Sequence, residues 1–148
     1  MNEEKVAQTV KQYRVLIADD EPWFVQPLRD ALEFEGYKVE NVGVGSAALA
    51  IVRSDDTRPA VLILDIMMDP GGLQGQHDEG ARTGLVVLEE LRKESNLATK
   101  NLPVICLTIV DDENLRKRIE QLGADFYSKR NYKVAEIVSR IRRLTNKN

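Results

Sequence analysis

One apolar run that ends in a carboxylate constrains this chain more than any other feature. Residues 60–64 read Ala-Val-Leu-Ile-Leu, Asp65 follows directly, and a Met-Met-Asp-Pro-Gly-Gly break begins at residue 67. A continuous apolar run closed by turn residues is typical of a strand that is buried on both faces, as in a parallel sheet. Asp65 would then lie at the carboxyl end of its strand, where open α/β sheets place their ligands.

Three other apolar runs also end in residues that can do chemistry. These endings are Asp19-Asp20-Glu21 after residues 15–18, Thr108 after residues 104–107, and Lys129 after residues 126–128. If the strands are parallel, all four endings meet at one edge of the sheet. The sequence therefore predicts a functional site at that edge.

Between these runs, apolar residues recur at helical spacing. Phe24, Leu28, Ala31 and Leu32 form one such stripe after Pro22. The other expected elements are an edge strand at 38–42, a short helix capped by Ser46, and helices at about 85–94, 115–122 and 134–144. A βα unit repeated five times predicts an α/β fold, with a doubly wound five-stranded parallel sheet and helices on both faces.

The composition places the chain among ordinary globular proteins. It has 148 residues, 43% of them hydrophobic and 30% charged, which is enough for one domain with its own core. No apolar stretch is long enough for a membrane span, and the first residues do not form a signal peptide, so a cytoplasmic location is expected. A net charge of −3 does not indicate a general nucleic-acid binder.

The predicted site combines like charges with one cation. Asp19, Asp20 and Asp65 would repel one another, so the site either raises a pKa or holds a cation. Carboxylate oxygens without nearby His or Cys suit Mg²⁺. Lys129 adds a cation and Thr108 a hydroxyl. Such a site could hold a phosphoryl group, and a carboxylate can itself be the nucleophile that accepts it.

In their order and positions, these residues resemble the receiver domain of two-component response regulators. The residues that carry the resemblance are Asp19-Asp20-Glu21, Asp65, Thr108, Lys129 and the approach Gly123-Ala124-Asp125. The resemblance covers about residues 13–145 and implies the flavodoxin-like strand order 2-1-3-4-5. It predicts a polar leader at 1–12 and a receiver (response regulatory) domain at 13–148.

The resemblance implies a role for each site residue. Asp65 would accept a phosphoryl group from a histidine kinase or a phosphotransfer protein. Asp20 and Asp65, with the backbone carbonyl of Met67, would bind Mg²⁺ directly, and Asp19 would act mainly through water. Lys129 would pair with Asp65 and then hold the phosphoryl oxygens.

The resemblance also implies a switch and shows three departures. Thr108 would swing toward the phosphoryl group, and Phe126 would follow it inward. The family usually has a proline after its lysine and a small residue after its threonine, where this chain has Arg130 and Ile109. The glycine that usually follows the acceptor appears only at Gly84, which implies an inserted loop at about 69–83.

The resemblance predicts a phosphoacceptor module of a two-component or phosphorelay system. The chain would be a stand-alone receiver rather than an enzyme, with at most self-phosphorylation from small donors and slow self-dephosphorylation. The alternative is a degenerate receiver-like binding module that keeps the fold without the phosphorylation cycle. We expect no DNA-binding domain and no membrane partner, and we expect output through a downstream protein. The basic last helix could bind that protein or could simply be a solvated face.

Overall fold

A five-stranded parallel sheet forms the centre of the molecule. The computed structural model describes residues 12–73 and 82–146. The strands are β1 (Arg14–Ala18), β2 (Lys38–Val42), β3 (Val61–Leu64), β4 (Val104–Thr108) and β5 (Asp125–Ser128). They are parallel in the order β2-β1-β3-β4-β5, so the predicted fold class is confirmed. Residues 1–11 of the predicted leader and residues 74–81 of the predicted insertion lie outside the described residues.

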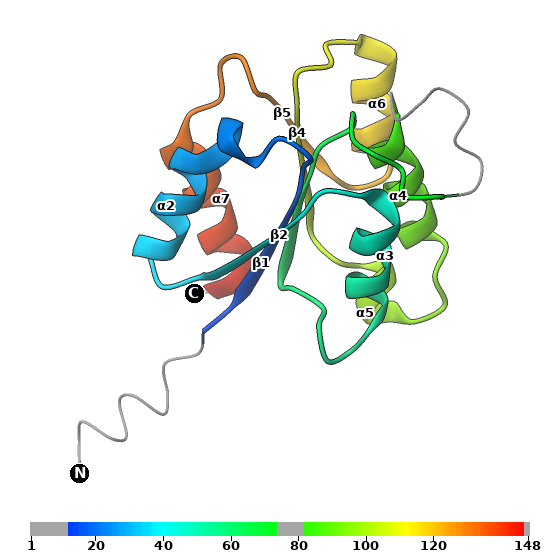
Figure 1. Ribbon diagram of the computed structural model, residues 1–148, viewed down its shortest axis with the longest axis horizontal. Helices are drawn as coiled ribbons and strands as arrows, with labels where there is room; N and C mark the ends of the chain where they lie inside the picture. The colour runs from blue at the N-terminus through cyan, green and yellow to red at the C-terminus, as the bar shows by residue number, and fades with distance from the viewer. Residues whose placement is uncertain (1–11, 74–81, 147–148) are drawn as a thin grey trace.

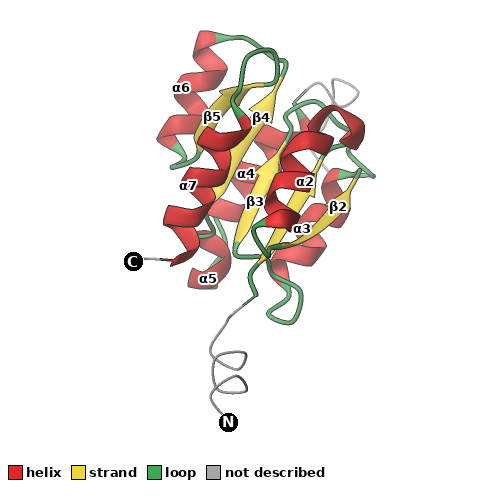
Figure 2. Ribbon diagram, turned by 90° about the vertical axis from the view of Figure 1, so that its left-hand side faces the viewer, coloured by secondary structure: helices red, strands yellow, loops and turns green. Residues whose placement is uncertain are grey.

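Helices cover both faces of the sheet (Figures 1 and 2). The helical elements are η1 (Pro22–Val25), α2 (Gln26–Phe34), α3 (Gly45–Arg53), α4 (Thr83–Arg92), α5 (Leu97–Lys100), α6 (Glu113–Gln121) and α7 (Val134–Asn146). The pair α2 and α7 packs on one face, while α3, α4 and α6 pack on the other. None of the described helices is long and apolar enough to cross a bilayer.

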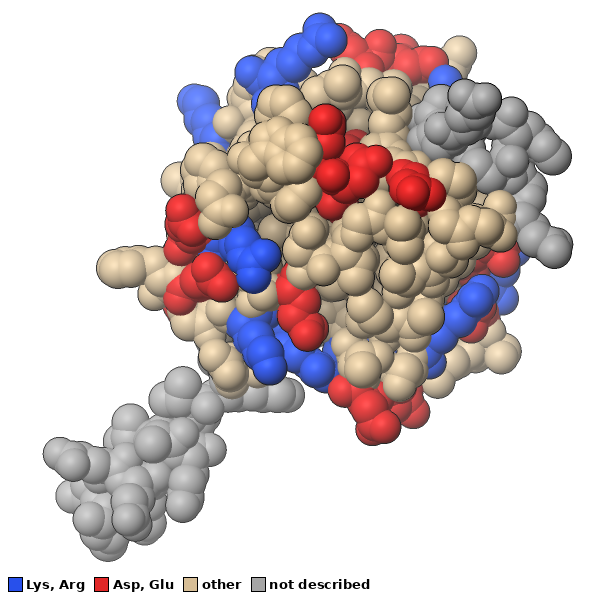
Figure 3. Space-filling view, in the orientation of Figure 1, with Lys and Arg blue, Asp and Glu red and all other residues tan. Residues whose placement is uncertain are grey.

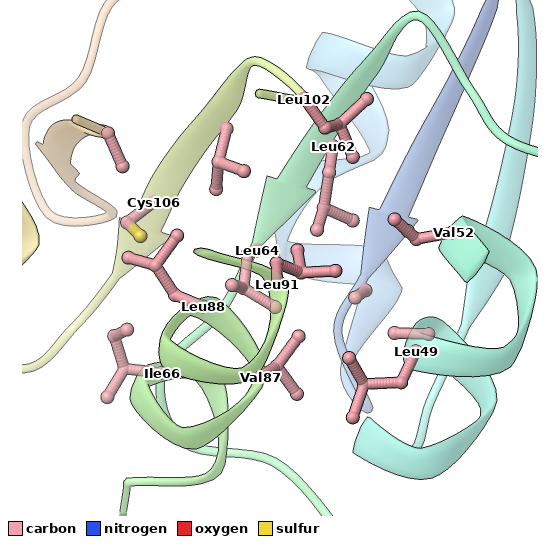
Figure 4. Close-up of a cluster of buried hydrophobic side chains, with 14 of the residues drawn as sticks. Leu49, Val52, Leu62, Leu64, Ile66, Val87, Leu88, Leu91, Leu102 and Cys106 are labelled. Atoms are coloured by element: carbon pink, nitrogen blue, oxygen red, sulfur yellow. The ribbon is translucent and has the colours of Figure 1, made fainter. Parts of the chain in front are cut away.

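Alternate strand residues divide between two hydrophobic cores. Leu62 and Leu64 of β3 face α3 and α4, whereas Val61 and Ile63 face α2 and α7. This division follows from the two-residue repeat of a strand. Figure 4 shows side chains of α4 packed against Leu62 and Leu64. Because β3 is buried on both faces, its packing fixes the backbone position of Asp65, which follows it.

The start of the first helical segment differs from the prediction. Pro22–Val25 is a 3₁₀ turn rather than the first turn of an α-helix. Val25 therefore takes the inward position, with 1% of its surface exposed, and Phe24 is 55% exposed. The expectation that Phe24 is part of the inward stripe was wrong, whereas Leu28 and Leu32 are buried as predicted.

Two further local predictions need correction. Ser46 does not cap α3, because Val44 is the N-cap and no side chain accepts a capping bond there. The first amides of α3 instead donate to the loop after Asp65, with Gly45 N bonded to Asp69 O at 2.8 Å and Ser46 N to Pro70 O at 3.1 Å. The one-turn helix α5, which Asn96 caps, was not predicted.

Candidate functional site

The carboxyl ends of four strands meet at one edge of the sheet, as the sequence predicted. Asp19 and Asp20 follow β1, Asp65 follows β3, Thr108 ends β4, and Lys129 follows β5. Backbone bonds continue the sheet into this edge, from Asp65 N to Ala18 O and from Lys129 N to Thr108 O, both at 2.9 Å. The hydrogen bonds of the sheet therefore fix the backbone positions from which these side chains extend.

Three carboxylates form a cluster at this edge. Asp19, Asp20 and Asp65 each offer an oxygen, and these oxygens lie within 4.8 Å of one another. Asp19 and Asp65 are buried and Asp20 is exposed. Each also accepts a backbone N–H bond, from Glu21 to Asp19 at 2.8 Å, from Met67 to Asp65 at 3.3 Å and from Asp69 to Asp20 at 3.2 Å. These bonds orient the oxygens of the cluster.

Lys129 supplies the counter-charge. Its Nζ lies 2.7 Å from Oδ2 of Asp19 and 2.9 Å from Oδ2 of Asp65. Burial works against the charge of this ammonium, but the hydrogen bonds to the two carboxylates outweigh it and raise the pKa of Lys129. Burial also raises the pKa of Asp65, and Lys129 opposes that shift without cancelling it. The raised pKa of Lys129 thus reflects its pairing with the carboxylates, whereas the raised pKa of Asp65 reflects its burial.

A wide cavity opens over the cluster. Its volume is about 890 Å³. Its lining residues are Asp20, Glu21, Trp23, Phe24, Asp65, Met67, Met68, Asp69, Pro70, Ile109 and Lys129. Figure 3 shows acidic side chains gathered in the upper part of the molecule beside uncharged ones. The site thus has an acidic floor, one cation and an exposed apolar rim formed by Trp23, Phe24, Met67 and Ile109.

The backbone of α4 packs directly against Asp65. A Cβ on Gly84 would lie 2.1 Å from the carbonyl oxygen of Asp65 and 2.7 Å from Cα of Ile66. Gly84 N also donates to Ile66 O at 2.8 Å. Only a residue without a side chain allows this approach. Gly84 therefore fixes where the chain returns after the loop that follows Asp65.

The two predicted switch residues lie near the site but in different surroundings. Thr108 is fully buried, and its Oγ1 accepts a bond from Val110 N at 3.2 Å. Phe126 is half-buried, packs against the core on the face of the sheet that α3, α4 and α6 cover, and has the guanidinium of Arg116 5.0 Å from its ring centroid.

The turn after Lys129 is held without a proline. Ser128 O accepts from Tyr132 N at 3.0 Å, and Ser128 Oγ accepts from Arg130 N at 3.2 Å. No peptide bond among the described residues is cis. Hydrogen bonds to Ser128 thus hold the turn that contains Arg130 in place of the usual proline.

Phe24 is the site residue that the sequence analysis missed. It was assigned to the inward stripe of a helix, yet it lines the cavity. A signal was present, because Val25, Leu28 and Leu32 also form an inward helical stripe and leave Phe24 outside it. The neighbouring Trp23 is exposed and lines the same cavity.

Comparisons with known proteins agree with the family resemblance of the sequence and with the fold. A family model described as "Response regulator receiver domain" matches residues 15–142. The "Probable transcriptional regulatory protein TcrX" of Mycobacterium tuberculosis is 34% identical over 130 residues, which are 88% of this chain and 48% of that protein. The chain spans about half the length of the curated relatives that it matches.

Two solved structures show the same fold. The receiver domain of Francisella response regulator 1452 has a TM-score of 0.70 and 23% identity, over 92% of this chain and 98% of that one. A DNA-binding response regulator of the LuxR family from Staphylococcus aureus has a TM-score of 0.66 and 23% identity, over 89% of this chain and 98% of that one.

The expectation about output partners was wrong. It assumed output through a downstream protein, with the basic last helix as one candidate surface and with no DNA-binding domain. The matched proteins include ones named as a transcriptional regulator and a DNA-binding regulator. In addition, two cations of α7 already have partners within the chain, since Arg140 pairs with Asp125 at 2.7 Å and Arg142 pairs with Glu35.

Proposed function

The chain belongs to the response regulator receiver domains, and on that premise we propose that it is a signalling module that a histidine kinase phosphorylates on Asp65. The observation that carries the proposal is the position of Asp65. Its carboxylate lies at the floor of an open cavity, between two other carboxylates and the ammonium of Lys129. The reading of the chain as a degenerate receiver has no support here, because the acidic and basic site residues are all present and lie together.

The donor set fits Mg²⁺. Three carboxylate oxygens within 4.8 Å of one another, without His or Cys in the group, are hard ligands. Asp20 and Asp65 would hold the ion together with the backbone carbonyl of Met67, and Asp19 would act through water. A bound divalent ion would neutralise charge on the phosphoryl oxygens as transfer takes place.

The residues of the chain would carry the transfer itself. A carboxylate oxygen of Asp65 attacks phosphorus, and the bond from phosphorus to the donor imidazole nitrogen breaks. The electron pair of that bond stays on the nitrogen, which then takes a proton from water. Lys129 gives up its bond to Asp65 and donates to a phosphoryl oxygen instead. The product is an acyl phosphate on Asp65.

The switch would follow from the new charge. In the unphosphorylated state the Thr108 hydroxyl accepts from Val110 N and lies near enough to Asp65 to oppose the rise in the pKa of that carboxyl. A phosphoryl oxygen on Asp65 offers Thr108 a strong acceptor, so its side chain turns toward the site. The half-buried ring of Phe126 then fills the space behind it. In this account the loop between β4 and α6 transmits the signal.

Phosphotransfer from a kinase tests this proposal. The chain is mixed with histidine kinases that carry a labelled phosphohistidine, with Mg²⁺ or with a chelator. Label that moves to the chain only with Mg²⁺, and that hydroxylamine removes as it does an acyl phosphate, supports the proposal. Absence of transfer from the kinases and from small acyl phosphates alike would contradict it. The inserted loop at 69–83, the domain limits and a cytoplasmic location stay predictions.

A further inference from the structure

An exposed phenylalanine ring lies beside the site lysine. The Nζ of Lys129 is 5.7 Å from the centroid of the Phe24 ring. Phe24 belongs to neither hydrophobic core, because the 3₁₀ turn at Pro22–Val25 places Val25 inward instead. A large ring that is not needed for the core and lies at the site calls for another role.

The position of the ring suits a cation. An ammonium within about 6 Å of an aromatic centroid is attracted by the negative face of the ring. The side chain of Lys129 is only 6% exposed, so water competes weakly for its charge. An ammonium has three N–H donors, and the carboxylates of Asp19 and Asp65 each receive one. The third N–H group makes neither of these two bonds, and the Phe24 ring lies close enough to attract the ammonium.

A second ring braces the first. The centroids of Trp23 and Phe24 are 6.2 Å apart, and the ring planes are tilted by 34°. Aromatic pairs at such separations stabilise each other. Trp23 therefore limits the orientations that the exposed Phe24 ring can adopt.

We propose that Phe24 is a positioning residue, whose ring holds the Lys129 ammonium in place over Asp65 for phosphoryl transfer. This inference rests on the proposed function. The carboxylates fix the lysine from the side of the acidic cluster, and the ring fixes it from the side of the cavity. When the bond between Lys129 and Asp65 gives way to one with a phosphoryl oxygen, the contact with the ring can remain.

Two variants separate the aromatic face from simple bulk. Phe24→Leu keeps an apolar side chain without a ring, and Phe24→Tyr restores a ring. Phe34→Leu is the matched control, because Phe34 ends α2, is 90% exposed and does not line the cavity. None of the three changes should lower the thermal unfolding midpoint, since both phenylalanines lie outside the core.

The first readout is the NMR signal of the Lys129 εCH₂ protons in metal-free, unphosphorylated protein. Loss of the ring current in Phe24→Leu should move these signals downfield, while Phe24→Tyr and Phe34→Leu should leave them near their wild-type positions. The second readout is the initial rate of phosphoryl uptake from a small acyl phosphate with Mg²⁺. We expect it to fall about two- to five-fold in Phe24→Leu and to recover in Phe24→Tyr.

The two readouts separate the possible failures. If the wild type takes up phosphoryl groups and Phe24→Leu does so equally fast, the inference is wrong while the proposed function stands. Unchanged Lys129 signals in Phe24→Leu would also overturn it, even if the unfolding midpoint fell. If the wild type takes up no phosphoryl group at all, the proposed function fails and this inference fails with it.

Discussion

Lys129 reaches Asp65 across a strand, because its Nζ lies 2.9 Å from Oδ2 of Asp65 although β4 separates the strands that carry the two residues. The same ammonium contacts Asp19, which follows β1. One long side chain thus links the carboxyl ends of β1, β3 and β5 above the end of β4. Any change in the charge of Asp65 acts directly on this link.

Removal of the ammonium should destabilise the metal-free protein. Lys129→Ala leaves the buried carboxylates of Asp19 and Asp65 unpaired, so we expect the free energy of unfolding to fall by roughly 3 kcal/mol. Mg²⁺ should recover most of this loss, because it replaces the missing positive charge. Urea denaturation with and without Mg²⁺ measures both effects.

The matched control is Lys93→Ala. Lys93 is 74% exposed and pairs with Glu90 at 3.7 Å, so its loss should cost less than about 1 kcal/mol. Equal losses in the two variants would show that the Lys129 pairs contribute no more than an exposed ion pair.

Asp20 should decide the affinity for the metal. Asp20→Asn keeps an acceptor for the Asp69 amide but removes the charge. The affinity for Mg²⁺ should fall at least about tenfold. The single tryptophan of the chain, Trp23, lines the same cavity, so its fluorescence can follow the titration. Asp30→Asn on α2 is the control, and a wild-type affinity in Asp20→Asn would remove Asp20 from the metal site.

Gly84 should not tolerate a methyl group. The Cβ of Gly84→Ala would meet backbone atoms of Asp65 and Ile66, which cannot turn aside as a side chain could. We expect a loss of roughly 1–3 kcal/mol in the free energy of unfolding and a displaced acceptor. Gly43→Ala provides a comparison near the same site, where the added Cβ would meet Asp20 Cα at an ordinary 3.6 Å. Similar stability of the two variants would contradict the close approach.

The sheet and the acidic cluster could be predicted from the sequence because both depend on local patterns. An apolar run such as residues 61–64 buries on both faces only in a sheet covered by helices. Parallel strands then bring their carboxyl ends together, whatever the loops do. The parallel arrangement of the strands is sufficient to bring Asp19, Asp65 and Lys129 together.

The orientation of Phe24 and the N-terminus of α3 could not be predicted, because neither follows from the pattern of a single segment. Only one of Val25 and Phe24 is buried, and in the 3₁₀ turn Pro22–Val25 it is Val25. Ser46 had the residue type of a cap, but carbonyls of the loop after Asp65 already satisfy the first amides of α3. Both outcomes arise from contacts between segments distant in sequence or from a small change in helix type.

The lifetime of the acyl phosphate should depend on the side chains at its opening. Met67 is exposed beside Asp65, and Val110 is half-buried after Thr108. Neither can hydrogen-bond a water and aim it at phosphorus, so self-dephosphorylation should be slow. A Met67→Asn, Val110→Glu protein should lose its phosphoryl group several-fold faster, as measured by decay of the labelled protein. Leu97→Asn, an exposed apolar position away from the cavity, should decay as the wild type does. Equal decay in the double variant would place the control of water elsewhere.

The most direct test of the account is the intact mass of the protein after incubation with a small acyl phosphate and Mg²⁺. The wild type should gain the mass of one phosphoryl group. Asp65→Asn keeps the size of the side chain and an acceptor for the Met67 amide but lacks the nucleophile, so it should gain none. A wild type that gains no mass, or an Asp65→Asn protein that gains as much as the wild type, would contradict the account.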